Sequence, residues 1–105
     1  MGVSFEIGEA VIKQEAHGNI SNHRWCSYGY VHDLAKEAGL TSLIEGYWMK
    51  PHAGIKLIGD CDIEEIEVAL LRPGLSKEFV HDLEWFRYWL KWAKMHCSIP
   101  CIKNA

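Results

Sequence analysis

The chain has 105 residues, of which 49% are hydrophobic and 24% are charged, and its formal net charge is −3. This composition is that of an ordinary globular chain and argues against disorder, and the length predicts one domain spanning residues 1–105. The acidic balance argues against a nucleic-acid-binding protein, which normally carries a basic excess. We see no basic segment followed by a long apolar run at the start and no stretch of ~18 apolar residues, so we expect no signal peptide, no membrane span and a cytoplasmic location.

The first part of the chain predicts a strand, a loop and a helix. Residues 3–15 fit a strand or a helix about equally well, and a weak alternation of apolar residues favours a strand in the first half, with a break at Gly8. Residues 17–23, HGNISNH, have the glycine, asparagine and serine content of a loop. Residues 27–38 show apolar positions at helical spacing, and Gly39 follows where a left-handed residue ends a helix.

The middle of the chain predicts a β-hairpin. Its arms are residues 43–49 and 55–58, and the connecting KPHAG carries a proline and a glycine as turn residues. The Ser42-x-x-Glu45 pattern, a capping box, allows a short helical start instead. Both interpretations stay open at this stage.

Two helices are predicted after the hairpin. Asp62, followed three positions later by a glutamate, is a helix-start pattern, and a Pro-Gly pair ends this helix. Ser76 is placed to cap a last helix that runs to about His96. This helix ends ahead of Pro100, because the residue before a proline avoids helical geometry.

The last helix is apolar on about half of its surface, whereas a surface helix normally needs closer to a third. One stripe is a complete core face and consists of Phe79, Leu83, Phe86, Leu90, Ala93 and Cys97. A second stripe, about 100° around the helix, consists of Trp85, Trp89, Trp92 and His96. Either both stripes are core, or the second is incompletely covered and meets a partner, since tryptophan, tyrosine and arginine dominate interface energies. We predict that the binding residues are Trp85, Trp89, Trp92, Tyr88 and His96.

One hexapeptide resembles a catalytic motif. Residues 31–36, VHDLAK, resemble the His-Asp core of the HD-type phosphohydrolases, in which the His-Asp pair helps hold a metal ion. That family also needs a metal-binding histidine well upstream and a later aspartate, within a larger helical domain. The recurrence of VHDL at residues 80–83 indicates that an amphipathic helix readily produces the pattern, so we assign no catalytic residue to it.

The cysteines allow three interpretations. His23-x2-Cys26 and Cys97-x3-Cys101 have spacings compatible with zinc, which prefers four cysteine or histidine ligands. Disulfides are a second possibility, and the sequence does not rank their pairings. Reduced, largely buried cysteines are the third and the one we favour for a cytoplasmic protein. We therefore expect no metal and no cofactor, and leave the zinc alternative open.

These elements predict an α+β fold with about three helices packed on a small antiparallel sheet or hairpin, and a long C-terminal helix. No phosphate-binding loop or nucleophile elbow occurs. We expect a non-enzymatic domain that binds a protein partner or a second copy of itself, and neither nucleic acid nor membrane. Immunity proteins and phage-type inhibitors of host proteins are small acidic proteins of this kind. The alternative is a small enzyme or ligand-binding domain, whose pocket would be formed by His17, His23, Trp25, Tyr28 and His32.

Overall fold

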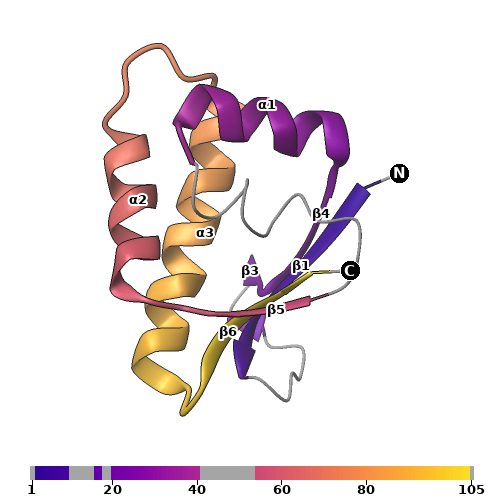
Figure 1. Cartoon of the computed structure of the whole chain (residues 1–105), viewed down its shortest axis with the longest axis vertical. Helices are drawn as coiled ribbons and strands as arrows, with labels where there is room; N and C mark the ends of the chain where they lie inside the picture. The colour runs from indigo at the N-terminus through magenta and orange to yellow at the C-terminus, as the bar shows by residue number, and fades with distance from the viewer. Residues whose placement is uncertain (1, 10–15, 18–19, 41–53, 105) are drawn as a thin grey trace.

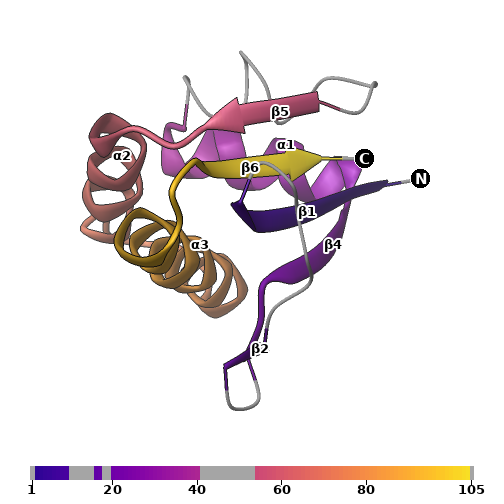
Figure 2. The ribbon, with the colours of Figure 1, turned by 90° about the horizontal axis from the view of Figure 1, so that it is seen from below.

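The computed structural model describes residues 2–9, 16–17, 20–40 and 54–104, and in these residues three helices pack on a four-stranded antiparallel sheet (Figure 1). The predicted α+β class, with a long C-terminal helix, is confirmed. In chain order the elements are β1 (Gly2–Glu9), β2 (Ala16–His17), β3 (Ile20–Ser21), β4 (His23–Ser27), α1 (Tyr28–Ala38), β5 (Gly54–Leu57), α2 (Asp60–Leu70), α3 (Lys77–His96) and β6 (Pro100–Asn104). Figures 1 and 2 show α2 and α3 running side by side next to the sheet.

The two central strands of the sheet come from opposite ends of the chain. The strand order is β4-β1-β6-β5, and β1 pairs with β6 through a register that places Ile7 opposite Ile102. The sequence analysis predicted neither β4 nor β6. Each strand has five residues, and such short segments become strands only through neighbours that are distant along the chain.

Two polar side chains fix the connections at one end of the sheet. The Glu9 carboxylate accepts hydrogen bonds from the backbone N–H groups of Ser98 (2.7 Å) and Ile99 (3.0 Å), which ties the turn between α3 and β6 to β1. The fully buried Asn22 donates from Nδ2 to the carbonyl of Ile7 at 2.9 Å, and its backbone carbonyl accepts from the Ile7 N–H. Both side chains satisfy backbone groups that the sheet ladder leaves unpaired.

Ser76 and Gly39 have the helix-end roles predicted for them, and Ser27, expected as the first residue of a helix, is its N-cap. Ser27 and Ser76 are the N-caps of α1 and α3, and each hydroxyl accepts a hydrogen bond from the backbone N–H three residues later. Gly39 has a φ of 70° and ends α1 in the left-handed conformation. Helix α2 begins at Asp60, two residues before the predicted start signal, and the Asp62 carboxylate accepts from the Gly59 N–H at 2.8 Å.

The loop and hairpin predictions were less accurate. Residues 17–23 were expected to be a loop, but β2 and β3 form a minimal antiparallel pair and β4 begins at His23. The second arm of the expected hairpin is a strand, β5, and it pairs with β6. The first arm, residues 43–49, and the alternative helical start lie outside the described residues.

The core is formed mainly by α3 against the sheet. The predicted core stripe is confirmed at Leu83, Phe86, Leu90 and Ala93, which are all buried, and its two ends are partly buried. Phe86 meets Phe5 of β1 edge to face, with ring centroids 5.3 Å apart. The expectation that the whole tryptophan stripe is incompletely covered was wrong for Trp89 and Trp85, which are 0% and 8% exposed and belong to the same core.

Replacing Phe86 with alanine should lower the free energy of unfolding by about 3–5 kcal/mol, because it removes a fully buried ring and leaves a cavity against Phe5. Urea denaturation of the wild type and the variant measures the difference. Met95→Ala on the same helix is the matched control, since Met95 is 81% exposed and should cost under ~1 kcal/mol. Equal losses in the two variants would show that Phe86 is not a core residue.

Candidate functional site

A groove of about 780 Å³ runs along α3 and is bounded on one side by the β3–β4 region. We call it the α3 groove. Helix α3 contributes His81, Glu84, Trp85, Arg87, Tyr88, Lys91, Trp92, Met95 and His96 to its lining, and the β3–β4 region contributes Ser21, His23 and Arg24. Its size is within the usual range of ligand-binding clefts.

Three side chains make the apolar floor of the α3 groove. Tyr88 and Trp92 are partly buried against the core, and Met95 is exposed. The Trp92 ring meets Trp89 edge to face at 5.2 Å and lies tilted against His96 at 5.2 Å. These contacts hold the aromatic side chains in place, so a ligand would meet a surface that is already formed.

The charged groups of the α3 groove are mostly cationic. Arg24, Arg87 and Lys91 line it, and Glu84 is the one carboxylate among its lining residues. Three histidines add further nitrogen donors or acceptors. This balance is opposite to that of the whole chain, in which 14 acidic residues outnumber 11 basic ones.

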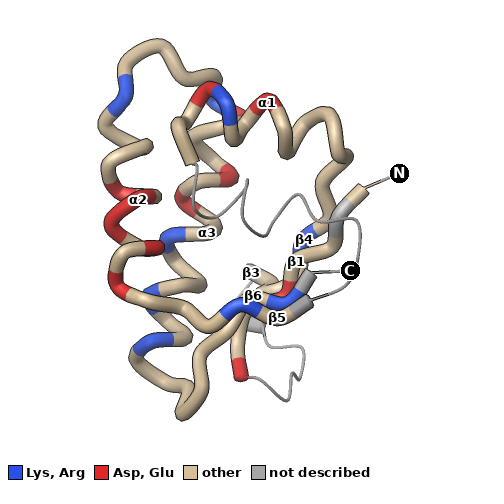
Figure 3. The backbone as a smooth tube through the Cα atoms, in the orientation of Figure 1, with Lys and Arg blue, Asp and Glu red and all other residues tan. Residues whose placement is uncertain are grey.

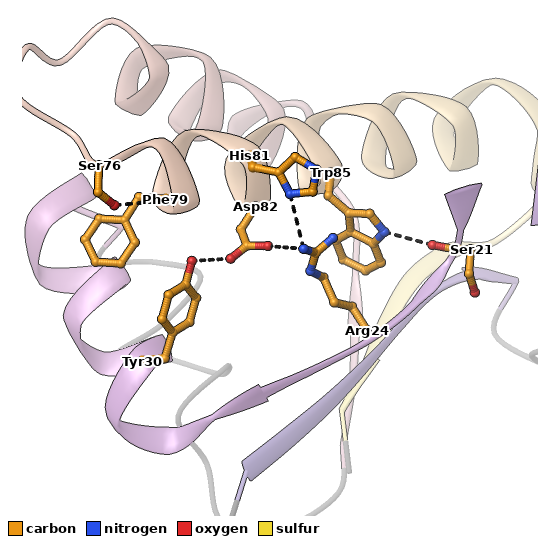
Figure 4. Close-up of polar contacts among 8 residues, drawn as sticks. All are labelled: Ser21, Arg24, Tyr30, Ser76, Phe79, His81, Asp82 and Trp85. Carbon is orange, nitrogen blue, oxygen red and sulfur yellow. Dashed lines mark hydrogen bonds and ion pairs between the residues drawn. The ribbon is translucent and has the colours of Figure 1, made fainter. Parts of the chain in front are cut away.

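Arg24, which lines the α3 groove, forms an ion pair with an aspartate that is nearly buried (Figure 4). Arg24 of β4 reaches Asp82 of α3, with 2.5 Å between Nη2 and Oδ1, and the Asp82 side chain is only 8% exposed. Tyr30 of α1 donates its hydroxyl hydrogen to the other Asp82 oxygen. The Asp82 carboxylate therefore joins α1, β4 and α3. Its partners supply the opposite charge and the hydrogen bond that a buried carboxylate needs.

The same arginine makes two further contacts that define the groove wall. Its Nη2 lies 3.3 Å from Nδ1 of His81, and because a guanidinium can only donate, His81 accepts at Nδ1. The guanidinium carbon stands 5.6 Å from the centre of the Trp85 ring, at cation–π distance. Trp85 in turn donates from Nε1 to the carbonyl of Ser21 at 2.8 Å, so the arginine and the indole are both held in position.

On the other side of Arg24 lies a smaller hollow of about 530 Å³, which Tyr30, Asp82 and the start of α3 also line. Burial and the hydrogen bond to Asp82 raise the pKa of Tyr30 well above its usual value. The phenol thus stays protonated and serves as a donor to the carboxylate. This hollow contains Asp82 and Glu78 as well as Arg24 and Lys77, so it has no net preference for an anion or a cation.

The zinc alternative requires four residues that the sheet separates. Cys26 lies opposite Val3 on β1, and Cys101 lies opposite Gly8, so these two cysteines point to opposite faces of the sheet. Both are buried, and Cys97 is partly buried. In the part of the chain that the structure describes, no group of three or more metal-ligating side chains comes together.

The structure brings four of the five predicted binding residues to the α3 groove. Trp85, Tyr88, Trp92 and His96 line it, whereas Trp89 does not. Trp89 is fully buried, so we leave it out of the binding surface. Whether the other four bind a partner stays a prediction.

Of the alternative-pocket residues whose side chains the structure describes, His23 lines one of the two hollows, and Trp25, Tyr28 and His32 line neither. His23 lines the α3 groove, but Trp25, on the same face of β4, is exposed and lines neither of the two hollows. His32, the histidine of the VHDLAK segment, is exposed on α1. The side chain of His17 lies outside the described residues.

Sequence reasoning missed Arg24, His81 and Met95. Met95 is on the predicted last helix at i+3 from Trp92, and this spacing could have identified it. The contact between Arg24 and His81 joins residues 57 positions apart, and no local pattern indicates it.

Comparisons with protein-family models, with curated proteins and with solved structures gave no match to this chain. No helix among the described residues has the length and apolar character needed to cross a membrane.

Replacing Arg24 with methionine should cost about 3 kcal/mol or more of unfolding free energy, because it leaves the Asp82 carboxylate buried without its cation. The double variant Arg24→Met/Asp82→Asn should be more stable than Arg24→Met alone, since it removes the uncompensated charge. Urea unfolding of both variants tests this pair. A loss below ~1 kcal/mol in the single variant would mean that the ion pair has no structural role.

The thiol of Cys26 should react slowly in the folded protein. Burial, with a smaller contribution from Asp82, raises its pKa to about 11 from 9.0, so little thiolate is present below that pH. The protonated thiol favours the fold, and this contribution is complete below about pH 9 and is lost as the pH rises through about 11. Peptide-level iodoacetamide labelling should modify exposed Cys61 well before Cys26 at pH 8. Equal labelling rates would contradict the burial of Cys26.

Proposed function

We propose that this chain is a protein-binding domain and that the α3 groove receives an acidic segment of a partner protein. The observation that carries the proposal is the combination of Tyr88, Trp92 and Met95 with surrounding cations in one groove. Aromatic side chains supply large contact areas at low entropic cost, and methionine adapts to the shape of a ligand. Immunity proteins and phage-type inhibitors are the functional classes that we propose for such a domain.

The charge of the groove favours a different protein over a second copy of this chain. An interface between identical acidic chains, each with a net charge of −3, starts from mutual repulsion. A partner segment that carries carboxylates would instead meet Arg87 and Lys91 beside the aromatic floor. The partner is therefore a protein segment with both acidic and apolar side chains.

The length of the lining indicates the size of the segment. The groove residues on α3 run from His81 to His96, a distance of roughly 22 Å at ~1.5 Å per helical residue. A helix of about four turns, or an extended segment of about seven residues, spans that distance. Short segments of this kind bind through a few anchor side chains inserted in a groove.

Site-specific photo-cross-linking in the cells that make this protein tests the proposal directly. A benzophenone amino acid is placed at Tyr88 or at Met95, and at Val68 of α2 as the control, since Val68 is 62% exposed but does not line the groove. Both groove positions should capture the same foreign protein through a peptide containing aspartate or glutamate, and Val68 should not. Cross-links to a second copy of the chain, to nucleic acid, or equally from Val68 would overturn the proposal.

Affinity measurements with the captured partner then separate binding from folding. Trp92→Ala should weaken the complex by about 30-fold, as expected for an aromatic hot spot, and Val68→Ala should leave it unchanged. Thermal unfolding of the same variants shows how much stability each one loses. If Trp92→Ala destabilises the fold and leaves the affinity intact, Trp92 is only a core residue.

A further inference from the structure

Two groups of cations line the α3 groove, and they differ in how firmly they are already paired. Arg24 forms a short ion pair with a buried carboxylate, at 2.5 Å from Asp82. Arg87 and Lys91 reach Glu67 of α2 at 3.4 and 3.5 Å, and all three side chains are 41–45% exposed. The first pair is part of the fold, whereas an exposed pair at these distances is weak and exchangeable.

We infer that Glu67 competes, within the chain, for the cations that a carboxylate of the partner would bind. The partner carboxylate displaces Glu67 from Arg87 and Lys91 on binding. This inference rests on the proposed function of the α3 groove. A single oxygen of Glu67, Oε2, serves both cations. A partner carboxylate can offer two oxygens to Arg87 in the fork geometry that guanidinium prefers, so exchange gains a better-formed contact.

The position of these cations decides where along the groove the acidic group binds. Near the N-terminus of α3 the groove is lined by Arg24 and Glu84, and Arg24 is already paired with Asp82, so this part offers no unpaired cation. Toward the C-terminus of α3, from Arg87 onward, the groove is lined by Arg87, Lys91 and the aromatic floor. No carboxylate lines this part. Figure 3 shows acidic residues along α2 next to basic residues on α3, which is the source of this competition. A partner carboxylate therefore binds beside Tyr88 and Trp92.

Fluorescence anisotropy with a labelled amphipathic peptide of glutamate and leucine tests the exchange, and the same peptide with glutamine for glutamate is the charge control. Glu67→Gln should tighten binding of the glutamate peptide about two- to five-fold, because it removes a competing exposed pair. Glu64→Gln, on the same helix, removes an exposed charge outside this cluster and should have a smaller effect. In the Arg87→Met/Lys91→Met background, Glu67→Gln should give no gain.

The possible failures are distinguishable. If the glutamate peptide binds no better than the glutamine peptide, the proposed acidic ligand is wrong and the inference fails with it. If the glutamate peptide binds better but Glu67→Gln and Glu64→Gln act alike, the groove takes acidic segments and only the role of Glu67 is refuted. A gain from Glu67→Gln that persists without Arg87 and Lys91 would also refute the exchange.

Discussion

The edge-to-face contact between Phe5 and Phe86 sets the position of α3 on the sheet. Phe5 lies on β1, one of the two central strands, and Phe86 lies near the middle of the longest helix, and both rings are buried. A helix is rigid, so fixing one residue on the sheet fixes the direction of every other one. Met95, nine residues after Phe86, points about 180° away from it. The outward side of α3, and hence the groove, follows from this contact.

The same geometry explains why the tryptophan stripe is divided between the core and the surface. Trp89 lies about 60° around the helix from Phe86, and Trp92 about 120°. Trp89 is therefore covered completely, whereas Trp92 is covered only in part. Sequence periodicity predicted both stripes but could not measure how far the sheet and the β3–β4 region extend around the helix. That coverage depends on the tertiary structure. The burial of Trp85, for example, depends on the β3–β4 region, where the Ser21 carbonyl accepts a hydrogen bond from its indole N–H.

Local signals predicted the helices well and the sheet poorly. The caps Ser27 and Ser76 and the αL residue Gly39 act within a few residues, so the sequence contains all that is needed to recognise them. Strand β6 is stabilised by β1, nearly a hundred positions earlier, and by β5. Its partners, and not its own pattern, make it a strand. The aromatic residues of the candidate site were predictable because they follow the local spacing of a helix. Arg24 was not predictable, because its contacts are with residues far away along the chain.

The chain is acidic overall although its groove is mostly cationic, because much of the acidic charge lies on a different helix from the groove cations. Helix α2 contains much of the negative charge that makes the chain acidic, and α3 places its cations beside it. The sign of the net charge therefore does not predict the sign of the charge that the groove favours, because the charged residues lining the groove are mostly cationic. Glu67 lowers the attraction of that field for anions in general. In the proposed complex an apolar contact with Tyr88 or Trp92 is then needed as well, and this double requirement would give selectivity for segments that are both acidic and apolar.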